Sequence, residues 1–156
     1  ALLGAKICEF PTTLEAAKTA KQMNNPVLMG APNIVRGGSQ SGNISAIDLV
    51  RADLCDALVS DYYYPALSQA ALELWQTGEL SFPKAWNLIS KNPASIMGKA
   101  SIGSLDYGMH ADLVIMNKET LQIEATMCGG RIAYAAGEAA NRLFEAPIPK
   151  MSVAAE

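Results

Sequence analysis

The feature that most constrains the fold is a pattern that occurs three times in the first half of the chain. A short apolar run, centred on residues 6–10, 26–30 and 55–60, is followed each time by a longer segment with helical spacing of its apolar side chains. Short apolar runs bounded by turns are typical of buried strands, and strands joined by helices pair in parallel. The pattern therefore predicts an α/β fold with parallel strands and helical crossovers.

Polar residues at capping positions mark where the crossover helices should begin. Thr12 and Glu15 have the spacing of a capping box, and Ser45 and Asp48 repeat that spacing after the second apolar run. Pro65 follows the third run, where a proline suits the first turn of a helix. Each apolar run is thus predicted to be a strand followed by a helix.

The pattern changes at about residue 98. A further helical pair precedes that point, with Asn92 and Pro93 at cap and first-turn positions. Residues 99–140 are rich in glycine and β-formers and leave no room for crossover helices, so they are predicted to be part of a small antiparallel β-sandwich. Residues 141–156 contain two prolines and no sustained period, which predicts an extended tail.

The composition excludes some classes of partner. The formal net charge is −3, and Lys and Arg are scattered, so no basic face is expected to follow a nucleic-acid backbone. No apolar stretch is long enough to span a bilayer, and the start of the chain does not resemble a signal peptide. Neither nucleic acid nor membrane is therefore an expected partner, and a cytoplasmic location is the default. Because the chain opens inside an apolar string, we expect it to begin partway through a larger protein.

Three long segments, in order, resemble a known family. EFPTTLEAAK (9–18), VLMGAPNIVRGGSQSGNISA (27–46) and SDYYYPAL (60–67), with the Asn-Pro and glycine pattern of 92–114, are similar to the amidohydrolase superfamily, and more narrowly to its members in phosphonate metabolism. The resemblance implies the C-terminal portion of a metal-dependent (β/α)₈ TIM barrel plus a small β-sandwich segment. Residues 1–98 would then be the last three strand–helix units with extra helices, and the first five units would be missing.

The resemblance also implies a reaction. It suggests the C-terminal part of a hydrolase whose substrate is a phosphorylated ribose phosphonate, a ribose 1-phosphonate 5-triphosphate. The products would be the 5-phosphate and pyrophosphate. The reaction would need a divalent metal, which we expect to be zinc. The single histidine, His110, lies in a turn of the β segment and is expected to be structural or exposed, and no His-x-His pair exists. We therefore expect this fragment alone to be inactive. Two alternatives stay open: an amidohydrolase that cleaves C–N bonds of a cyclic amide or amine, and a non-catalytic barrel remnant that acts as an interaction module.

Asp61 carries the strongest catalytic signal, because it follows an apolar strand at the position where barrels build their active sites. In the superfamily, the aspartate after the last strand binds a metal and takes a proton from the attacking water, and the resemblance implies both roles for Asp61. The residues alone favour a helix-capping role. Glu9 at another strand end is either a solvated or capping group or, by the resemblance, near the metal ligands or the substrate. Tyr62 either lines the substrate pocket or packs on the barrel end.

The loop after the second apolar run is a candidate anion site. Its donors are Arg36, Gly37, Gly38, Ser39, Ser41 and Asn43. Arg36 offers a fixed fork of N–H groups, and glycines let backbone N–H groups approach an anion. A flexible connection is the alternative, since the loop is no Walker motif. Gln40 stands where relatives are expected to carry histidine, and it donates hydrogen bonds but carries no proton at neutral pH.

An isolated part of a barrel also predicts an assembly. Three parallel strands outside a closed barrel would leave two unpaired edges and exposed apolar side chains. We therefore expect a homo-oligomer in which the barrel-derived surface makes the main contact.

Overall fold

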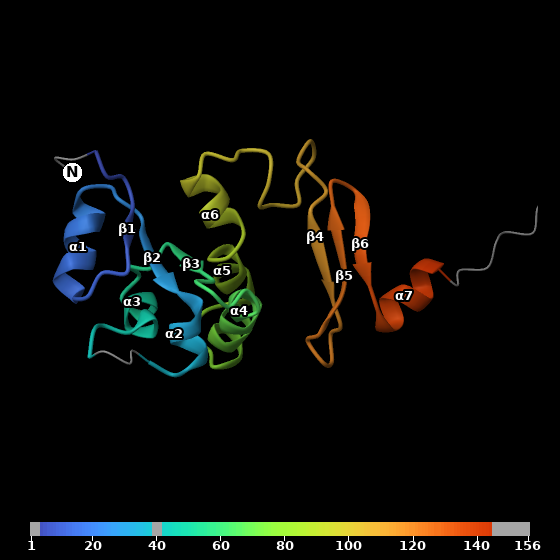
Figure 1. Cartoon of the computed structure of the whole chain (residues 1–156), viewed down its shortest axis with the longest axis horizontal. Coiled ribbons are helices and arrows are strands. Elements are labelled where there is room, and N and C mark those ends of the chain that lie inside the picture. Colours follow the sequence, from blue (N-terminus) through green and yellow to red (C-terminus); the bar gives the residue numbers. More distant parts are fainter. Residues whose placement is uncertain (1–3, 39–41, 145–156) are drawn as a thin grey trace, which may run out of the picture. The chain divides into compact units, whose positions relative to one another are not determined.

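The computed structural model describes residues 4–38 and 42–144, and the chain divides into two compact units, Ala1–Ser104 and Leu105–Glu156. The first unit contains a parallel sheet with helices, and the second contains an antiparallel sheet and one described helix (Figure 1). Within the first unit, the predicted α/β fold with parallel strands is confirmed. None of the described helices is long and apolar enough to cross a membrane.

The sheet of the first unit follows the order of the chain. Its strands are β1 (Cys8–Glu9), β2 (Val27–Gly30) and β3 (Ala57–Val59), paired in parallel in the order β1-β2-β3. The helices of this unit are α1 (Leu14–Gln22), α2 (Ala31–Val35), α3 (Ala46–Arg51), α4 (Ala66–Gln76), α5 (Phe82–Asn87) and α6 (Lys91–Ile96). Because the strands pair in parallel, all three carboxyl ends lie at one edge of the sheet.

The core of the first unit is built from small and aliphatic side chains. In α4, Ala66, Ala70 and Leu74 recur every four residues on one face and are fully buried. Leu49 of α3 and Val27 of β2 are also fully buried, and complete burial of such a side chain stabilises a fold by about 1.5–3 kcal/mol. The crossover helices and α4 therefore contribute apolar faces to one core with the sheet.

Two helices begin at residues other than those predicted. The N-cap of α1 is Thr13, not Thr12, and its side chain accepts a hydrogen bond from Ala16 N at 3.1 Å. Asn92 does not cap α6, which begins one residue earlier. Its Nδ2 instead donates to the carbonyl oxygen of Asp56 at 2.8 Å and so ties α6 to the residue before β3. The second correction depends on a contact between residues 36 positions apart, which local sequence spacing does not contain.

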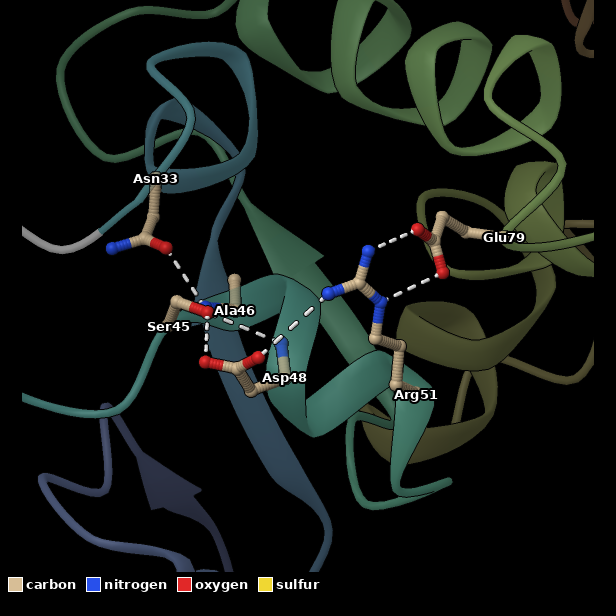
Figure 2. Close-up of polar contacts among 6 residues, drawn as sticks. All are labelled: Asn33, Ser45, Ala46, Asp48, Arg51 and Glu79. Carbon is tan, nitrogen blue, oxygen red and sulfur yellow. Dashed lines mark hydrogen bonds and ion pairs between the residues drawn. The ribbon is translucent and has the colours of Figure 1, made fainter.

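At the start of α3, Ser45 is the N-cap as predicted, and its side chain makes one of the two hydrogen bonds of a capping box. Ser45 Oγ accepts from Asp48 N at 3.2 Å and donates to Asp48 Oδ2 at 2.6 Å (Figure 2). At the other end of α3, Arg51 Nε donates to Glu79 Oε2 at 2.9 Å, and a second N–H of the guanidinium donates to Oε1. This two-bond ion pair joins α3 to the turn after α4.

The Arg51–Glu79 pair gives the first unit an acid-sensitive contribution to its stability. The hydrogen bond and charge of Arg51 lower the pKa of Glu79 below its ordinary value. The contribution is therefore full above the unfolded pKa of about 4.3 and is lost as pH falls through the lower folded pKa. We expect the free energy of unfolding, measured with urea between about pH 5 and pH 3, to fall less steeply in Glu79→Gln than in wild type. Glu119→Gln, at an exposed position of the second unit, is the control, and parallel curves for Glu79→Gln and wild type would contradict the prediction.

The second unit is a three-stranded antiparallel sheet followed by a helix. Its elements are β4 (Leu113–Met116), β5 (Ile123–Cys128), β6 (Arg131–Ala135) and α7 (Gly137–Phe144), and the strands pair in the order β4-β5-β6. Glu124 of β5 accepts hydrogen bonds from Asn117 Nδ2 at 2.8 Å and from Ala139 N in the first turn of α7 at 3.1 Å. Its carboxylate therefore links the end of β4 to the start of α7.

The helix α7 corrects the expected tail. Residues 141–144 were expected to begin an extended segment, but they form the last turns of α7, where Arg142 pairs with Glu138 one turn earlier at 2.9 Å. Residues 145–156 lie outside the described residues. A single sheet is described in residues 105–144, so the second layer of a sandwich stays a prediction.

Candidate functional site

A pocket of about 260 Å³ lies at the edge of the first unit where the parallel strands end. Residues that follow β1, β2 and β3 all contribute to it, which is the expected place for a binding site in an α/β sheet. The lining residues are Phe10, Pro11, Met29, Gly30, Pro32, Asn33, Arg36, Gly38, Asn43, Ile44, Asp61 and Tyr62. The pocket thus combines apolar walls with a carboxylate, a guanidinium and amide groups.

The chain leaves two of the strands through unusual backbone conformations. Phe10, after β1, has φ of +53°, and Asp61, after β3, has φ of +54°. Aspartate adopts this left-handed region more readily than most residues, whereas for a bulky phenylalanine it is a rare conformation. At the end of β2, a Cβ on Gly30 would lie 3.5 Å from Phe10 Cε1, so the ring lies close to this strand end. The surrounding structure therefore holds both turns at the edge of the pocket.

Arg36 and Tyr62 connect two loops across the pocket. Arg36 ends α2, and its guanidinium donates to the hydroxyl of Tyr62, which follows β3. The guanidinium carbon is also 5.8 Å from the centre of the tyrosine ring, within the range of a cation–π contact. Both side chains are exposed to solvent. The positive charge of Arg36 is thereby held at the pocket and accessible to a ligand.

The structure gathers most of the predicted site residues that it describes. Those that line the pocket are Arg36, Gly38, Asn43, Asp61 and Tyr62. Gly37 and the exposed Glu9 at the end of β1 are not among the lining residues. Ser39, Gln40 and Ser41 lie outside the described residues. The N–H groups of Gly37 and Gly38 were predicted to face an anion, but they donate to the carbonyl oxygens of Ile34 at 2.8 Å and Asn33 at 3.0 Å. The roles of the other residues stay predictions.

Asn33 is a pocket residue that the sequence did not single out. It is half-buried in α2, and its Oδ1 accepts from Ala46 N, at the start of α3, at 2.8 Å (Figure 2). The bond therefore joins α2 to α3, the helices on either side of the candidate anion loop. A signal was present in the sequence: Asn33 is the one polar side chain of the helix APNIV, directly before that loop.

The remaining candidate from the sequence, His110, is exposed and belongs to the second unit. Across residues 4–38 and 42–144, no group of three His, Cys, Asp or Glu side chains is arranged to hold a metal ion. Asp61 is therefore a single carboxylate at the pocket, able to supply one oxygen ligand or to accept a proton.

Comparison with known proteins gives one strong sequence relationship, while no protein-family model matches the chain. Over 119 residues, 75% of its length, the chain is 44% identical to the α-D-ribose 1-methylphosphonate 5-triphosphate diphosphatase of Escherichia coli strain K12. The chain spans about a third of that relative, 32% of its length.

Two solved structures share the fold. A β-aspartyl dipeptidase from Fervidobacterium islandicum AW-1, solved with a β-Asp-Leu dipeptide, matches 79% of this chain and 37% of its own with a TM-score of 0.62. An amidohydrolase from Thermotoga maritima MSB8 matches 82% of this chain and 43% of its own with a TM-score of 0.55. Both are 14% identical, so they bear on the fold alone. The resemblance to a diphosphatase of phosphonate metabolism is therefore confirmed by sequence over three quarters of the chain, and the fold is shared with two solved structures, one of which is an amidohydrolase.

Proposed function

We propose that this chain is the C-terminal part of a metal-dependent hydrolase of phosphonate metabolism. Its substrate would be a ribose 1-phosphonate 5-triphosphate, and its products the 5-phosphate and pyrophosphate. The observation that carries the proposal is the pocket at the carboxyl ends of three parallel strands, where Arg36 and Asp61 both lie. The name of the diphosphatase relative supports the substrate class. In the intact protein, β1, β2 and β3 would be the last three strands of a (β/α)₈ TIM barrel.

The pocket has the chemistry that such a substrate requires. A triphosphate is a polyanion, and the guanidinium of Arg36 can donate two parallel hydrogen bonds to phosphoryl oxygens. The amide of Asn43 lies at the same pocket and can add a neutral donor, whereas the N–H of Gly38 already donates to the carbonyl oxygen of Asn33 at 3.0 Å. The Asp61 carboxylate would accept the proton of the attacking water as the bond to the pyrophosphate leaving group breaks.

A divalent metal, zinc in our proposal, would lower the pKa of the attacking water and stabilise charge on the phosphoryl group. Asp61 fits one ligand position, because its carboxylate lines the pocket. A zinc site needs about three protein ligands, and the described residues contain no such group. The other ligands would come from the rest of the intact protein, so residues 1–156 alone are expected to show no hydrolase activity.

We also propose that residues 1–156 on their own, where β1 has no further strand to pair with among the described residues, form a homo-oligomer that associates through the first unit. Ile7 before β1 is 39% exposed and Phe10 after it is 45% exposed, which supports an apolar contact along this edge strand.

Arg36→Ala tests the proposed substrate. In the intact protein, we expect this change to weaken triphosphate binding by about 2 kcal/mol, roughly 30-fold, because a charge-assisted hydrogen bond is lost. Metal affinity should not change, since Arg36 is no metal ligand. Calorimetric titration with substrate under non-turnover conditions, and separately with metal, measures both quantities.

Arg131→Ala is the matched control, because Arg131 is exposed on β6 of the second unit. Equal substrate affinity in wild type and Arg36→Ala would remove Arg36 from the site. It would also favour the hydrolase of a cyclic amide or amine, which needs no cation in its pocket.

A further inference from the structure

We propose that Asn33 is a further anion-binding residue of the pocket, and that the backbone of α3 holds its side-chain amide in the donating orientation. This inference rests on the proposed function and adds a binding group to it. It assigns a direct ligand contact to a residue whose visible hydrogen bond is structural.

The first step is the bond at the start of α3. The first N–H groups of a helix have no partner within the helix. Ala46 is the first residue of α3, and its N–H donates to Asn33 Oδ1 at 2.8 Å. Ser45 accepts the N–H of Asp48 in the same turn, so two of these groups are satisfied by side chains (Figure 2).

The second step is the orientation of the amide. An asparagine amide has one acceptor oxygen and one nitrogen that donates two hydrogen bonds. A backbone N–H can pair only with the oxygen, so the bond to Ala46 fixes which atom faces α3. Figure 2 shows the Asn33 nitrogen pointing away from Ala46. If the amide were rotated by half a turn, its N–H groups would face the N–H of Ala46. Two donors cannot bond each other, so only the observed orientation keeps the hydrogen bond.

The third step is access. Residues 4–38 and 42–144 offer Asn33 Nδ2 no hydrogen-bond acceptor, and they contain no buried side-chain nitrogen or oxygen without a partner. Asn33 lines the pocket, and Nδ2 is the amide atom that the bond to Ala46 leaves unused, so the proposal assigns the ligand contact to Nδ2. Arg36 follows three residues later, and residues at this spacing lie on the same side of a helix.

The ligand class follows from the fixed donor. A free asparagine can turn its amide to suit a donor or an acceptor, but Asn33 can present only N–H groups to the pocket without losing the bond to Ala46. Beside the guanidinium of Arg36, such a donor suits an oxyanion with several acceptor oxygens, such as a phosphoryl group. It disfavours cations and ligand N–H groups at the same position.

Asn33→Asp separates the two roles of this side chain. The carboxylate keeps an acceptor for Ala46 N, and a negative charge is favourable at the start of a helix, so the melting temperature should stay at or above that of wild type. The pocket, however, would receive an oxygen in place of the donor. We expect the Kd of the intact protein for inorganic tripolyphosphate, measured by calorimetry at pH 7.5, to rise at least about tenfold.

Asn24→Asp is the matched control for charge. Asn24 lies in the turn after α1, beside Asp56 at the amino end of β3, and it has φ of +56°, which aspartate also tolerates. Its Kd should stay within about twofold of wild type. Asn33→Ala should lose both roles, with a lower melting temperature and a weaker affinity.

The outcomes separate this inference from the proposed function. A Kd for Asn33→Asp within twofold of wild type, or an equal loss in Asn24→Asp, would overturn it. If Asn33→Asp does not fold, the wild-type protein decides, because an Asn33 side-chain ¹⁵N resonance that does not shift at saturating tripolyphosphate would overturn it as well. If wild type binds no tripolyphosphate, the inference fails at once. Turnover of the ribose triphosphate substrate and the Arg36→Ala result then decide the proposed function on their own.

Discussion

Asp61→Asn is expected to lower kcat of the proposed intact hydrolase by at least about 100-fold, the usual range for loss of the general base that Asp61 is proposed to be. Asparagine has nearly the same shape and also tolerates the φ of +54° found at this position, so the strand end should keep its conformation. It cannot accept the proton of the attacking water, and its neutral oxygen is a weaker ligand for a divalent metal. Steady-state kinetics, with the metal content of each preparation measured, test this expectation.

Asp53→Asn is the matched control for Asp61→Asn. Asp53 is also an exposed aspartate in the left-handed region, with φ of +56°, but it lines a different pocket, next to the residues that precede β3. Its replacement should leave kcat within about twofold of wild type. If both variants keep wild-type kcat, or if both lose it equally, Asp61 has no special role in proton transfer.

Gly103→Ala is expected to destabilise the first unit by about 3 kcal/mol. Gly103 has φ of +91°, and a Cβ there would lie 2.9 Å from Ala94 Cβ and 3.0 Å from both Lys91 Cα and Ser90 O. Two of these three atoms, Lys91 Cα and Ser90 O, belong to the backbone at the start of α6. Rotation of a side chain cannot move them away from the added methyl group. The methyl group would therefore add a steric cost to the cost of the left-handed backbone.

Gly98→Ala separates these two costs. Gly98 follows α6 with φ of +66°, and a Cβ there would meet no atom within 4 Å. This variant should lose only about 1–2 kcal/mol, the cost of the backbone conformation. Urea unfolding followed by tryptophan fluorescence reports on the first unit, which contains Trp75 and Trp86. Equal losses in the two variants would show that the contact of Gly103 with α6 is not tight.

Much of the first unit could be predicted because its signals are local. The alternation of apolar runs and helical spacing predicted parallel strands joined by helices, as observed, and Ser45 caps α3 as its spacing with Asp48 predicted. Local signals did not locate the N-cap of α1, because two threonines are adjacent there. Thr12 and Thr13 are the same residue type, so propensity cannot choose between them, and the structure shows that Thr13 accepts from Ala16 N.

The candidate site was predictable in part. Arg36 and Asp61 belong to loops that follow parallel strands, and parallel strands in chain order bring such loops to one edge. The contact of Arg36 with Tyr62 and the bond of Asn33 to Ala46 were not predictable, because they depend on distances between α2, β3 and α3. Side-chain hydrogen bonds of this kind need groups placed to within a few tenths of an ångström.

The sequence by itself determined the strand–helix alternation, the resemblance to amidohydrolases and the residue types available at the strand ends. These features follow from periodicity and residue chemistry, which depend on residues that are close together in the sequence. Only the tertiary structure decided that Asn92 bonds to Asp56, that Asn33 bonds to Ala46, and that Arg36 lies beside Tyr62. These contacts join residues 13 to 36 positions apart, and only packing of the helices on the sheet brings such residues within hydrogen-bonding distance.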